Sequence, residues 1–181
     1  MKAIFLLIIL AVSMLIALVI QDFLPSPTLL KGAHIVLLPI LFAYGALVLP
    51  FPAMLVLAII AGGLTDLSVP QIVNAKVEIG LGSSIIIYAV LGTIMQGVQK
   101  AFFRGAWWLH PPLSALCTFL LLTLQYLMIA LRRESIFFNE TVIWKILIPT
   151  IIAFFLSPLI EALFILIERA LPNLQRPPRG Y

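Results

Sequence analysis

Long uninterrupted apolar runs, separated by short polar breaks, dominate the chain. Six such runs are present, at residues 3–20, 33–49, 53–64, 79–98, 111–131 and 142–167. A helix needs about 20 consecutive apolar residues to cross the hydrocarbon core of a bilayer, whereas a membrane β-barrel needs strands of alternating apolar and polar residues. The continuous runs therefore predict an all-α polytopic membrane protein, a compact bundle of six transmembrane helices.

The ends of the first three runs indicate how these helices connect. We interpret the first run as a retained helix, because it exceeds the roughly 7–15 apolar residues of a signal peptide and no small-x-small cleavage site follows it. Pro50-Phe51-Pro52 predicts a tight turn, since proline does not continue a helix from within. The third run is short and leads into Gly62-Gly63-Leu64-Thr65-Asp66. This ending predicts a broken or tilted helix that closes in a glycine-containing turn.

The overall composition agrees with lipid, rather than water, as the solvent. Of 181 residues, 63% are hydrophobic and 10% are charged, against about 45–50% and 25% in soluble domains. So few charged side chains do not cover a water-exposed surface, which excludes a soluble enzyme, a nucleic-acid-binding protein and a disordered chain. We expect one six-helix transmembrane domain over residues 1–171 and a flexible cytoplasmic tail, rich in proline and arginine, over 172–181.

Basic residues in the connecting segments indicate the orientation, because cytoplasmic loops of membrane proteins carry the excess of lysine and arginine. With the N-terminus inside, the cytoplasmic set is Lys2, Lys100, Arg104, Arg169, Arg176 and Arg179. The outer set is then Lys31, Lys76, Arg132, Arg133 and Lys145. This small difference favours a cytoplasmic location for both termini.

Groups that could carry out chemistry are scarce in the sequence. One cysteine, Cys117, excludes an intrachain disulfide, and the two histidines are too far apart for the usual zinc spacings. No nucleophile–base pair, phosphate-binding loop or metal-ligand cluster occurs in the sequence, so we expect no catalytic residue, no cofactor and no metal. His34 and His110 stand at the starts of spans and are interpreted as interfacial residues.

Two carboxylates stand out, because an ionised group at bilayer depth costs at least about 2.5–3.5 kcal/mol. As a functional residue, either carboxylate anchors a partner helix, lines a polar pocket or takes part in a proton relay. Asp66 either accepts hydrogen bonds from the free N–H groups at a neighbouring helix start or is a solvated loop acid. Glu161 follows Ser157-Pro158, where the proline removes a backbone hydrogen bond and favours a kink. We predict that Glu161 faces the protein interior or a partner helix. The alternative is a shallow position from which it reaches the cytoplasmic headgroups.

Glycines bracket the polar stretch that follows the third run. Gly62 and Gly63 precede residues 65–78, and Gly80 and Gly82 follow them. The stretch either dips back into the bundle or lies in water, and the shortness of the third run favours the first. Small residues four apart, such as Ala58 and Gly62, allow two helices to approach closely in lipid.

Three elements of the sequence resemble a known family. They are Gly63-Leu64-Thr65-Asp66 after the third run, Gly80-Leu81-Gly82 at the start of the fourth, and Pro158 in the last run before Arg169. With six helices and almost no loops, the chain resembles the rod-shape-determining protein MreD over about residues 37–171. The spacer 67–79, which carries Lys76 and Glu78, departs from the pattern of that family.

The resemblance implies a non-catalytic adaptor in the bacterial inner membrane. Such a protein binds the single-span protein MreC and helps couple the MreB filament to lateral-wall peptidoglycan synthesis by RodA and a class B transpeptidase. An alternative is the substrate-binding S component of an energy-coupling-factor vitamin transporter, of similar size and fold. S components tend to show alanines four apart on the first helix, and no such pair occurs here. The candidates for structural or partner-binding roles are Gly62, Gly63, Asp66, Gly80, Gly82, Pro158 and Glu161.

Overall fold

The computed structural model of the chain describes residues 2–23, 36–68, 71–73, 76–78, 82–103, 110–132 and 140–170. These residues form six α-helices and two short strands, namely α1 Lys2–Phe23, α2 Leu38–Val48, α3 Phe51–Ser68, β1 Gln71–Val73, β2 Lys76–Glu78, α4 Ser83–Phe103, α5 His110–Arg132 and α6 Glu140–Ala170. A helix occupies each of the six apolar runs, so the predicted helical bundle is confirmed. Four helices, α1, α3, α5 and α6, are long and apolar enough to cross a membrane.

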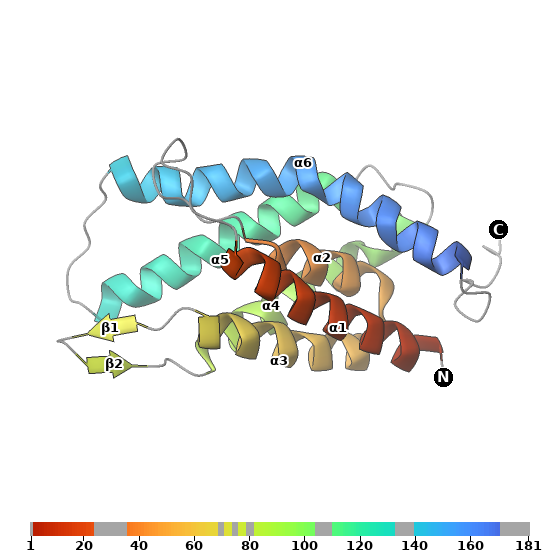
Figure 1. Cartoon of the computed structure of the whole chain (residues 1–181), viewed down its shortest axis with the longest axis horizontal. Coiled ribbons are helices and arrows are strands. Elements are labelled where there is room, and N and C mark those ends of the chain that lie inside the picture. Colours follow the sequence, from red (N-terminus) through yellow and green to blue (C-terminus); the bar gives the residue numbers. More distant parts are fainter. Residues whose placement is uncertain are drawn as a thin grey trace.

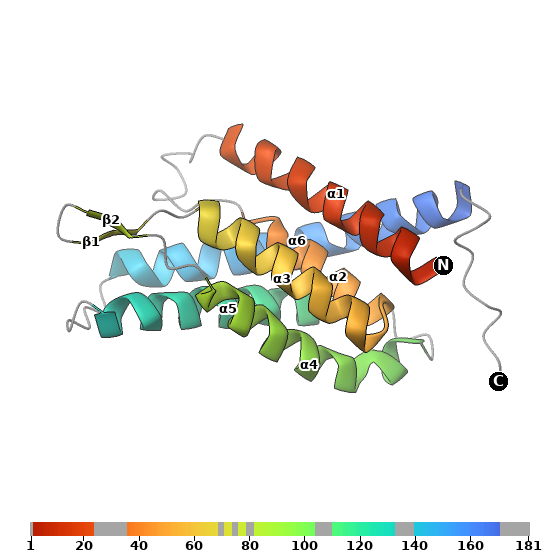
Figure 2. The same ribbon diagram turned by 90° about the horizontal axis from the view of Figure 1, so that it is seen from below.

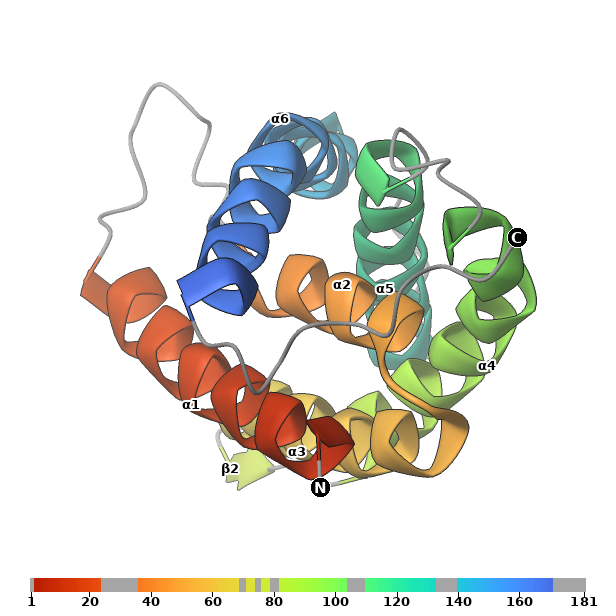
Figure 3. The same cartoon turned by 90° about the vertical axis from the view of Figure 1, so that its right-hand side faces the viewer.

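Consecutive helices run in opposite directions along the long axis of the molecule (Figure 1). The start of α1 and the end of α6 therefore lie at the same end of the bundle. Viewed along that axis, α1, α3, α4, α5 and α6 form a ring around α2 (Figure 3). All five surrounding helices contact α2. The shortest helix is thus the central one.

The central helix is apolar on every side because every side is covered by protein. All residues of α2 from Leu38 to Leu47 are buried. Phe42 packs edge-on against Tyr88 of α4, and Tyr44 stacks on Phe164 of α6, each pair with ring centroids 4.8 Å apart. Such contacts add to the burial of the rings themselves. The core of the molecule therefore lies around α2.

Both ends of α2 lie inside the bundle, where lipid offers no hydrogen-bond partners. Its 11 residues extend about 16 Å, roughly half the thickness of the hydrocarbon core. At the start of the helix, the side-chain carbonyl of Gln21 accepts a hydrogen bond from the Leu37 N–H at 3.1 Å. At its end, the amide of Gln96 donates to the carbonyls of Ala46 and Leu49, at 2.8 and 2.9 Å. Side chains of α1 and α4 therefore satisfy backbone groups that water would otherwise have to reach.

The outer faces of the helices are as apolar as the interior. Exposed side chains are Ile4, Ile8 and Val19 on α1, Ile86, Val90 and Ile94 on α4, and Phe155, Leu159 and Leu166 on α6. In water, so much continuous apolar surface would drive association, whereas hydrocarbon solvates it. The surface therefore fits a membrane environment.

Close approach of α3 and α4 depends on Gly62. A Cβ atom at this position would lie 2.4 Å from the Cα atom of Ile85, which is backbone and has no freedom to move away. Ala58, one turn earlier, is also fully buried. The predicted role of these small residues in helix packing is confirmed at this contact.

Two expectations about the segment around α3 need correction. α3 is a continuous helix that includes Gly62 to Asp66, so this element is not the predicted turn. The favoured re-entrant segment is instead an antiparallel strand pair, in which Gln71 lies opposite Glu78. This hairpin extends past the end of α3 and lies, along the long axis, level with the end of α5 and the start of α6 (Figures 1 and 2). The predicted tail 172–181 lies outside the described residues.

Candidate functional site: two polar clusters between helices

The first cluster forms where α3 meets the start of α4, around Asp66. Asp66 is 7% exposed. Its Oδ2 atom accepts a hydrogen bond from the Gly82 N–H at 2.7 Å, and its Oδ1 atom accepts one from the Ser84 N–H at 3.3 Å. The predicted hydrogen bonds to a neighbouring helix start are therefore confirmed, and the solvated loop acid is not what the structure shows.

The position of Asp66 follows from the chemistry of helix ends. The first N–H groups of a helix have no partner within it, and the helix dipole favours negative charge there. Side chains that cap a helix usually come from the residue just before it. Here the carboxylate comes from the preceding helix, 16 residues away from Gly82. Asp66 thereby joins two helices as well as capping one.

Gly82 gives the chain the turn that makes this cap possible. Its φ of +102° is in the region that side-chain-bearing residues rarely adopt. The other glycines contribute unequally: Gly62 is a packing contact, whereas a Cβ at Gly63 would meet nothing within 4 Å. Gly80 lies outside the described residues. Of the bracketing glycines, the structure therefore assigns clear physical roles to Gly62 and Gly82.

The Asp66 cluster extends into α5 through side chains that the sequence did not single out. Gln125 of α5 donates from Nε2 to the Ser84 hydroxyl at 3.0 Å. On the other side of Asp66, the hydroxyls of Thr65 and Tyr88 lie 3.3 Å apart. A glutamine in the middle of an apolar helix is itself a signal of an interhelical hydrogen bond. That signal would have placed Gln125 among the candidates.

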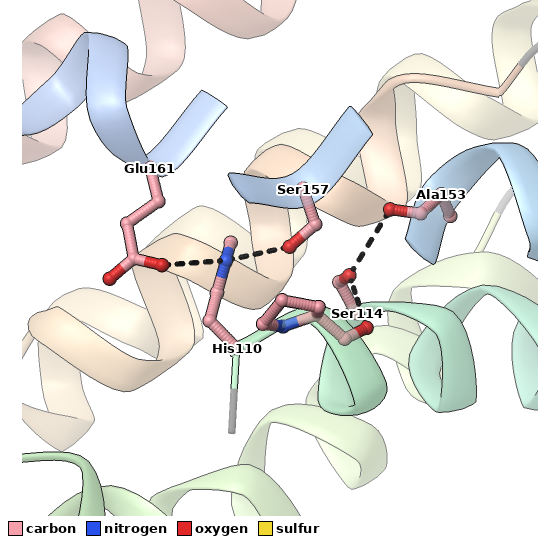
Figure 4. Close-up of polar contacts among 6 residues, drawn as sticks. His110, Ser114, Ala153, Ser157 and Glu161 are labelled. Atoms are coloured by element: carbon pink, nitrogen blue, oxygen red, sulfur yellow. Dashed lines mark hydrogen bonds and ion pairs between the residues drawn. The ribbon is translucent and has the colours of Figure 1, made fainter. Parts of the chain in front are cut away.

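The second cluster lies between α5 and α6, around His110 (Figure 4). His110 is fully buried, and Glu161 is 6% exposed. The Nδ1 atom of His110 lies 2.7 Å from the Ser157 hydroxyl and 3.5 Å from Oε2 of Glu161. The prediction that Glu161 faces the interior is confirmed. The ring of His110 packs inside the protein, a position that its interpretation as an interfacial residue did not include.

Neighbouring side chains position this cluster. Pro111 follows His110 at the start of α5, where the missing proline N–H costs nothing. Tyr44 of α2 covers the imidazole edge-on, with ring centroids 5.7 Å apart. Ser114 extends the polar contacts by donating to the carbonyls of Pro111 at 3.0 Å and Ala153 at 3.5 Å. The cluster is thus enclosed by α2, α5 and α6.

Pro158 lies inside α6, which remains one helix from Glu140 to Ala170. Proline at this position leaves the carbonyl four residues earlier without its helical donor. The two α6 residues that reach His110 are Ser157 and Glu161, one on each side of this proline. Polar side chains and a weakened backbone therefore occur on the same stretch of helix.

The second cluster contains a serine, a histidine and a glutamate, yet its geometry differs from that of a hydrolytic triad. In a triad, the hydroxyl and the acid contact opposite ring nitrogens, so that a proton moves through the imidazole. Here both groups approach the same atom, Nδ1. The arrangement holds two helices together and is not preorganised for proton relay from the serine.

Comparisons with known proteins place the chain in no family. No family model, curated protein or solved structure matches it. Within the described ranges, no group of three or more histidine, cysteine or acidic side chains could hold a metal ion. The features of the described residues that bear on function are therefore the two clusters and the bundle that they hold together.

Proposed function

We propose that this chain is a non-catalytic adaptor of the bacterial inner membrane, similar to MreD. In this proposal it binds an MreC-like single-span protein and thereby helps couple MreB to peptidoglycan synthesis by RodA and its transpeptidase. Its work is to present a rigid helical surface to other membrane proteins. It performs no reaction and needs no cofactor.

One observation carries the proposal: residues behind the resemblance meet at a single structural joint. Asp66 closes the Gly63-Leu64-Thr65-Asp66 element, and it accepts hydrogen bonds from Gly82 and Ser84 at the start of α4. Gly62, next to this element, has no side chain, so the backbone of α3 lies close to the backbone of α4 at Ile85. A motif that fixes the geometry of a helix pair supports a scaffold, because a scaffold must hold its binding surface in shape.

The membrane arrangement is part of the same proposal. We infer that all six helices traverse the membrane region, with α2 as a short central pass enclosed by the others. The alternating helix directions and the shared location of the start of α1 and the end of α6 support this topology (Figure 1). The hydrogen bonds at both ends of α2 support it too, since a helix that stops inside the bundle needs protein partners.

Co-purification tests the proposed partner. The tagged full chain is expressed with an MreC-like protein from the same genome, and the pair is isolated in mild detergent. The parent chain should retain the partner, and Asp66→Ala should lose it or accumulate poorly, because the α3–α4 joint is weakened. Ser68→Ala is the matched control, since the Ser68 hydroxyl bonds within its own helix, to the Leu64 carbonyl.

The outcome also separates the adaptor from the vitamin-transporter alternative. Retention of the MreC-like protein, with restored rod shape in cells that lack their own MreD, supports the adaptor. If the chain neither retains the MreC-like protein nor restores rod shape, and the purified chain binds a vitamin saturably, the S component replaces the adaptor as the proposed function.

A further inference from the structure

The last part of α6 extends past the start of α5. His110 is the first residue of α5, and it contacts α6 at Ser157 and Glu161. Because α5 and α6 run in opposite directions, the part of α6 that follows these contacts continues beyond α5 (Figure 1). Residues 159–170 extend about 18 Å, and we call this segment the α6 arm.

Pro158 weakens the helix at the base of the α6 arm. It lies inside α6, and its missing N–H removes one hydrogen bond of the helix there. Proline is a common cause of sharp bends in long helices. α6 changes direction near the middle of its length, which agrees with a bend in this region (Figures 1 and 2). The arm therefore begins at a point where the helix bends more easily.

The imidazole ring of His110 contacts α6 on both sides of Pro158. Its Nδ1 atom lies 2.7 Å from the hydroxyl of Ser157, which precedes the proline, and 3.5 Å from Oε2 of Glu161, which belongs to the arm. Buried polar contacts rigidify the structure around them. A ring that is fixed at the start of α5 thus holds the two sides of the weakened turn in one relative position.

The α6 arm also borders the most open junction of the ring around α2. Phe164 of the arm stacks on Tyr44 of α2, with ring centroids 4.8 Å apart, whereas Leu159, Leu163 and Leu166 are exposed. Among the described residues, neighbouring helices of the ring approach each other closely at every junction except that between α6 and α1 (Figure 3). An outward movement of the arm would therefore separate the stacked rings and widen this junction toward α2.

We propose that the α6 arm is a hinged gate of the bundle. Pro158 is the hinge, and the contact of His110 with Ser157 and Glu161 is the latch. With the latch in place, the arm covers α2. Without it, the arm bends away and opens the junction between α6 and α1, while the other helices keep their arrangement. The inference concerns the isolated chain and does not depend on the partner in the proposed function.

Distances between two spin labels, measured by pulsed electron paramagnetic resonance on the full chain in lipid nanodiscs, test the gate. Cys117 is first replaced by alanine, so that the introduced cysteines are the only labelled sites. Ile59→Cys with Leu166→Cys gives the arm distance. Ile59→Cys with Phe155→Cys gives the reference distance, because Phe155 precedes the hinge. All three positions are exposed, and Ile59 belongs to α3.

The parent should give one narrow distribution for each distance. Leu166 lies about 12 Å beyond Pro158 along the helix, so a change of about 20° in the bend moves it by about 4 Å. His110→Leu should shift or broaden the arm distance by about this amount and leave the reference distance unchanged. Addition of Pro158→Ala should make the arm distance narrow again, because the helix regains a backbone hydrogen bond. Pro149→Ala, at the other proline inside α6, is the matched control and should not do so.

Two milder variants keep the gate testable if His110→Leu does not accumulate. Ser157→Ala and Glu161→Gln each weaken one contact of the latch, and each should broaden the arm distance but not the reference distance. An arm distance that stays unchanged in every latch variant would overturn the gate. So would an equal change in the reference distance, or an arm distance that remains broad when Pro158→Ala is added.

Discussion

At the scale of single residues, the carboxylate of Asp66 accepts hydrogen bonds from N–H groups at the start of α4, which have no partner within that helix. The two donor–acceptor distances are 2.7 and 3.3 Å, and Asp66 itself is buried, with 7% of its surface exposed. An aspartate in this position stabilises the fold through hydrogen bonds and through the helix dipole together. Its neighbour Thr65 bonds to the Ala61 carbonyl instead, within its own helix. Of these two adjacent polar residues on α3, Thr65 thus bonds to its own helix and Asp66 bonds to the start of α4.

Asp66→Ala should lower the free energy of unfolding by about 1–3 kcal/mol, because two buried donors lose their acceptor. Asp66→Asn should cost less, since the amide oxygen still accepts one hydrogen bond. Chemical or thermal unfolding of the purified full chain measures both. Equal stability of the alanine variant and the parent would show that water replaces the carboxylate.

Gly62 and Gly63 are adjacent glycines with different surroundings, which makes them a matched pair. Gly62→Ala should destabilise the protein, by about 1–3 kcal/mol for an overpacked site, because the new Cβ would meet the Ile85 backbone at 2.4 Å. Gly63→Ala should be neutral or stabilising by up to about 1 kcal/mol, since nothing lies within 4 Å and alanine favours helix. Unfolding of both variants under one condition decides the matter. A similar loss in each would mean that the loss does not arise from the contact between Gly62 and Ile85.

At the scale of elements, α2 shows how a short helix is kept inside a bundle. Its side chains are held by aromatic contacts, and its terminal backbone groups by glutamines of neighbouring helices. Gln99 adds a third contact at the C-terminal end, donating to the Leu49 carbonyl at 2.9 Å. Apolar residues at these positions would leave polar backbone facing hydrocarbon. The glutamines are therefore part of the core.

Replacement of Gln96 and Gln99 together by leucine should destabilise the chain more than either single change. Loss of Gln96 removes the side-chain donor of the Ala46 carbonyl, whereas the Leu49 carbonyl loses its last side-chain donor only when both glutamines are replaced. A buried carbonyl left without a donor costs about 1–3 kcal/mol. The carbonyl of Leu49 accepts from both amides, so the two effects should not be additive. Thr93→Ala provides the control on the same helix, because the exposed Thr93 hydroxyl bonds to the Ala89 carbonyl of its own helix. A double variant as stable as this control would show that the two glutamines do not stabilise the end of α2.

The sequence predicts local structure much better than long-range pairing in this protein. Apolar runs place all six helices, because lipid demands continuous apolar surface and helices satisfy their own backbone. The cap by Asp66 was predictable, since a carboxylate in the polar break between two apolar runs can accept hydrogen bonds from the free N–H groups at the next helix start. The pairing of His110 with Glu161 was not, because 51 residues separate the two and nothing in the run around His110 distinguishes a buried histidine from an interfacial one. The hairpin was missed because its three-residue strands leave no clear apolar alternation.

At the scale of the whole molecule, the number of membrane crossings fixes the side on which the hairpin lies. If α1, α3, α5 and α6 alone cross, a cytoplasmic N-terminus places β1 and β2 on the cytoplasmic side, after two crossings. α1 and α3 would then cross in opposite directions, whereas they run in the same direction in Figure 1. If α2 and α4 cross as well, the hairpin follows three crossings and lies outside. The start of α6 lies outside in both arrangements. A residue in β2 therefore distinguishes six spans from four, whereas a residue at the start of α6 reports orientation.

Lys76→Cys should accordingly react with a membrane-impermeant thiol reagent added to intact cells. The buried Cys117 is first replaced by alanine, so that the new cysteine is the sole thiol. Glu140→Cys is the positive control, since the start of α6 is external under either arrangement. Labelling at both positions supports six spans with the hairpin outside. Labelling at Glu140→Cys, with Lys76→Cys reacting after cell disruption alone, would establish four spans and overturn the shared direction of α1 and α3 in the fold. Failure at Glu140→Cys, with a periplasmic reporter active at the C-terminus, would instead reverse the orientation, because the start of α6 would then face the cytoplasm.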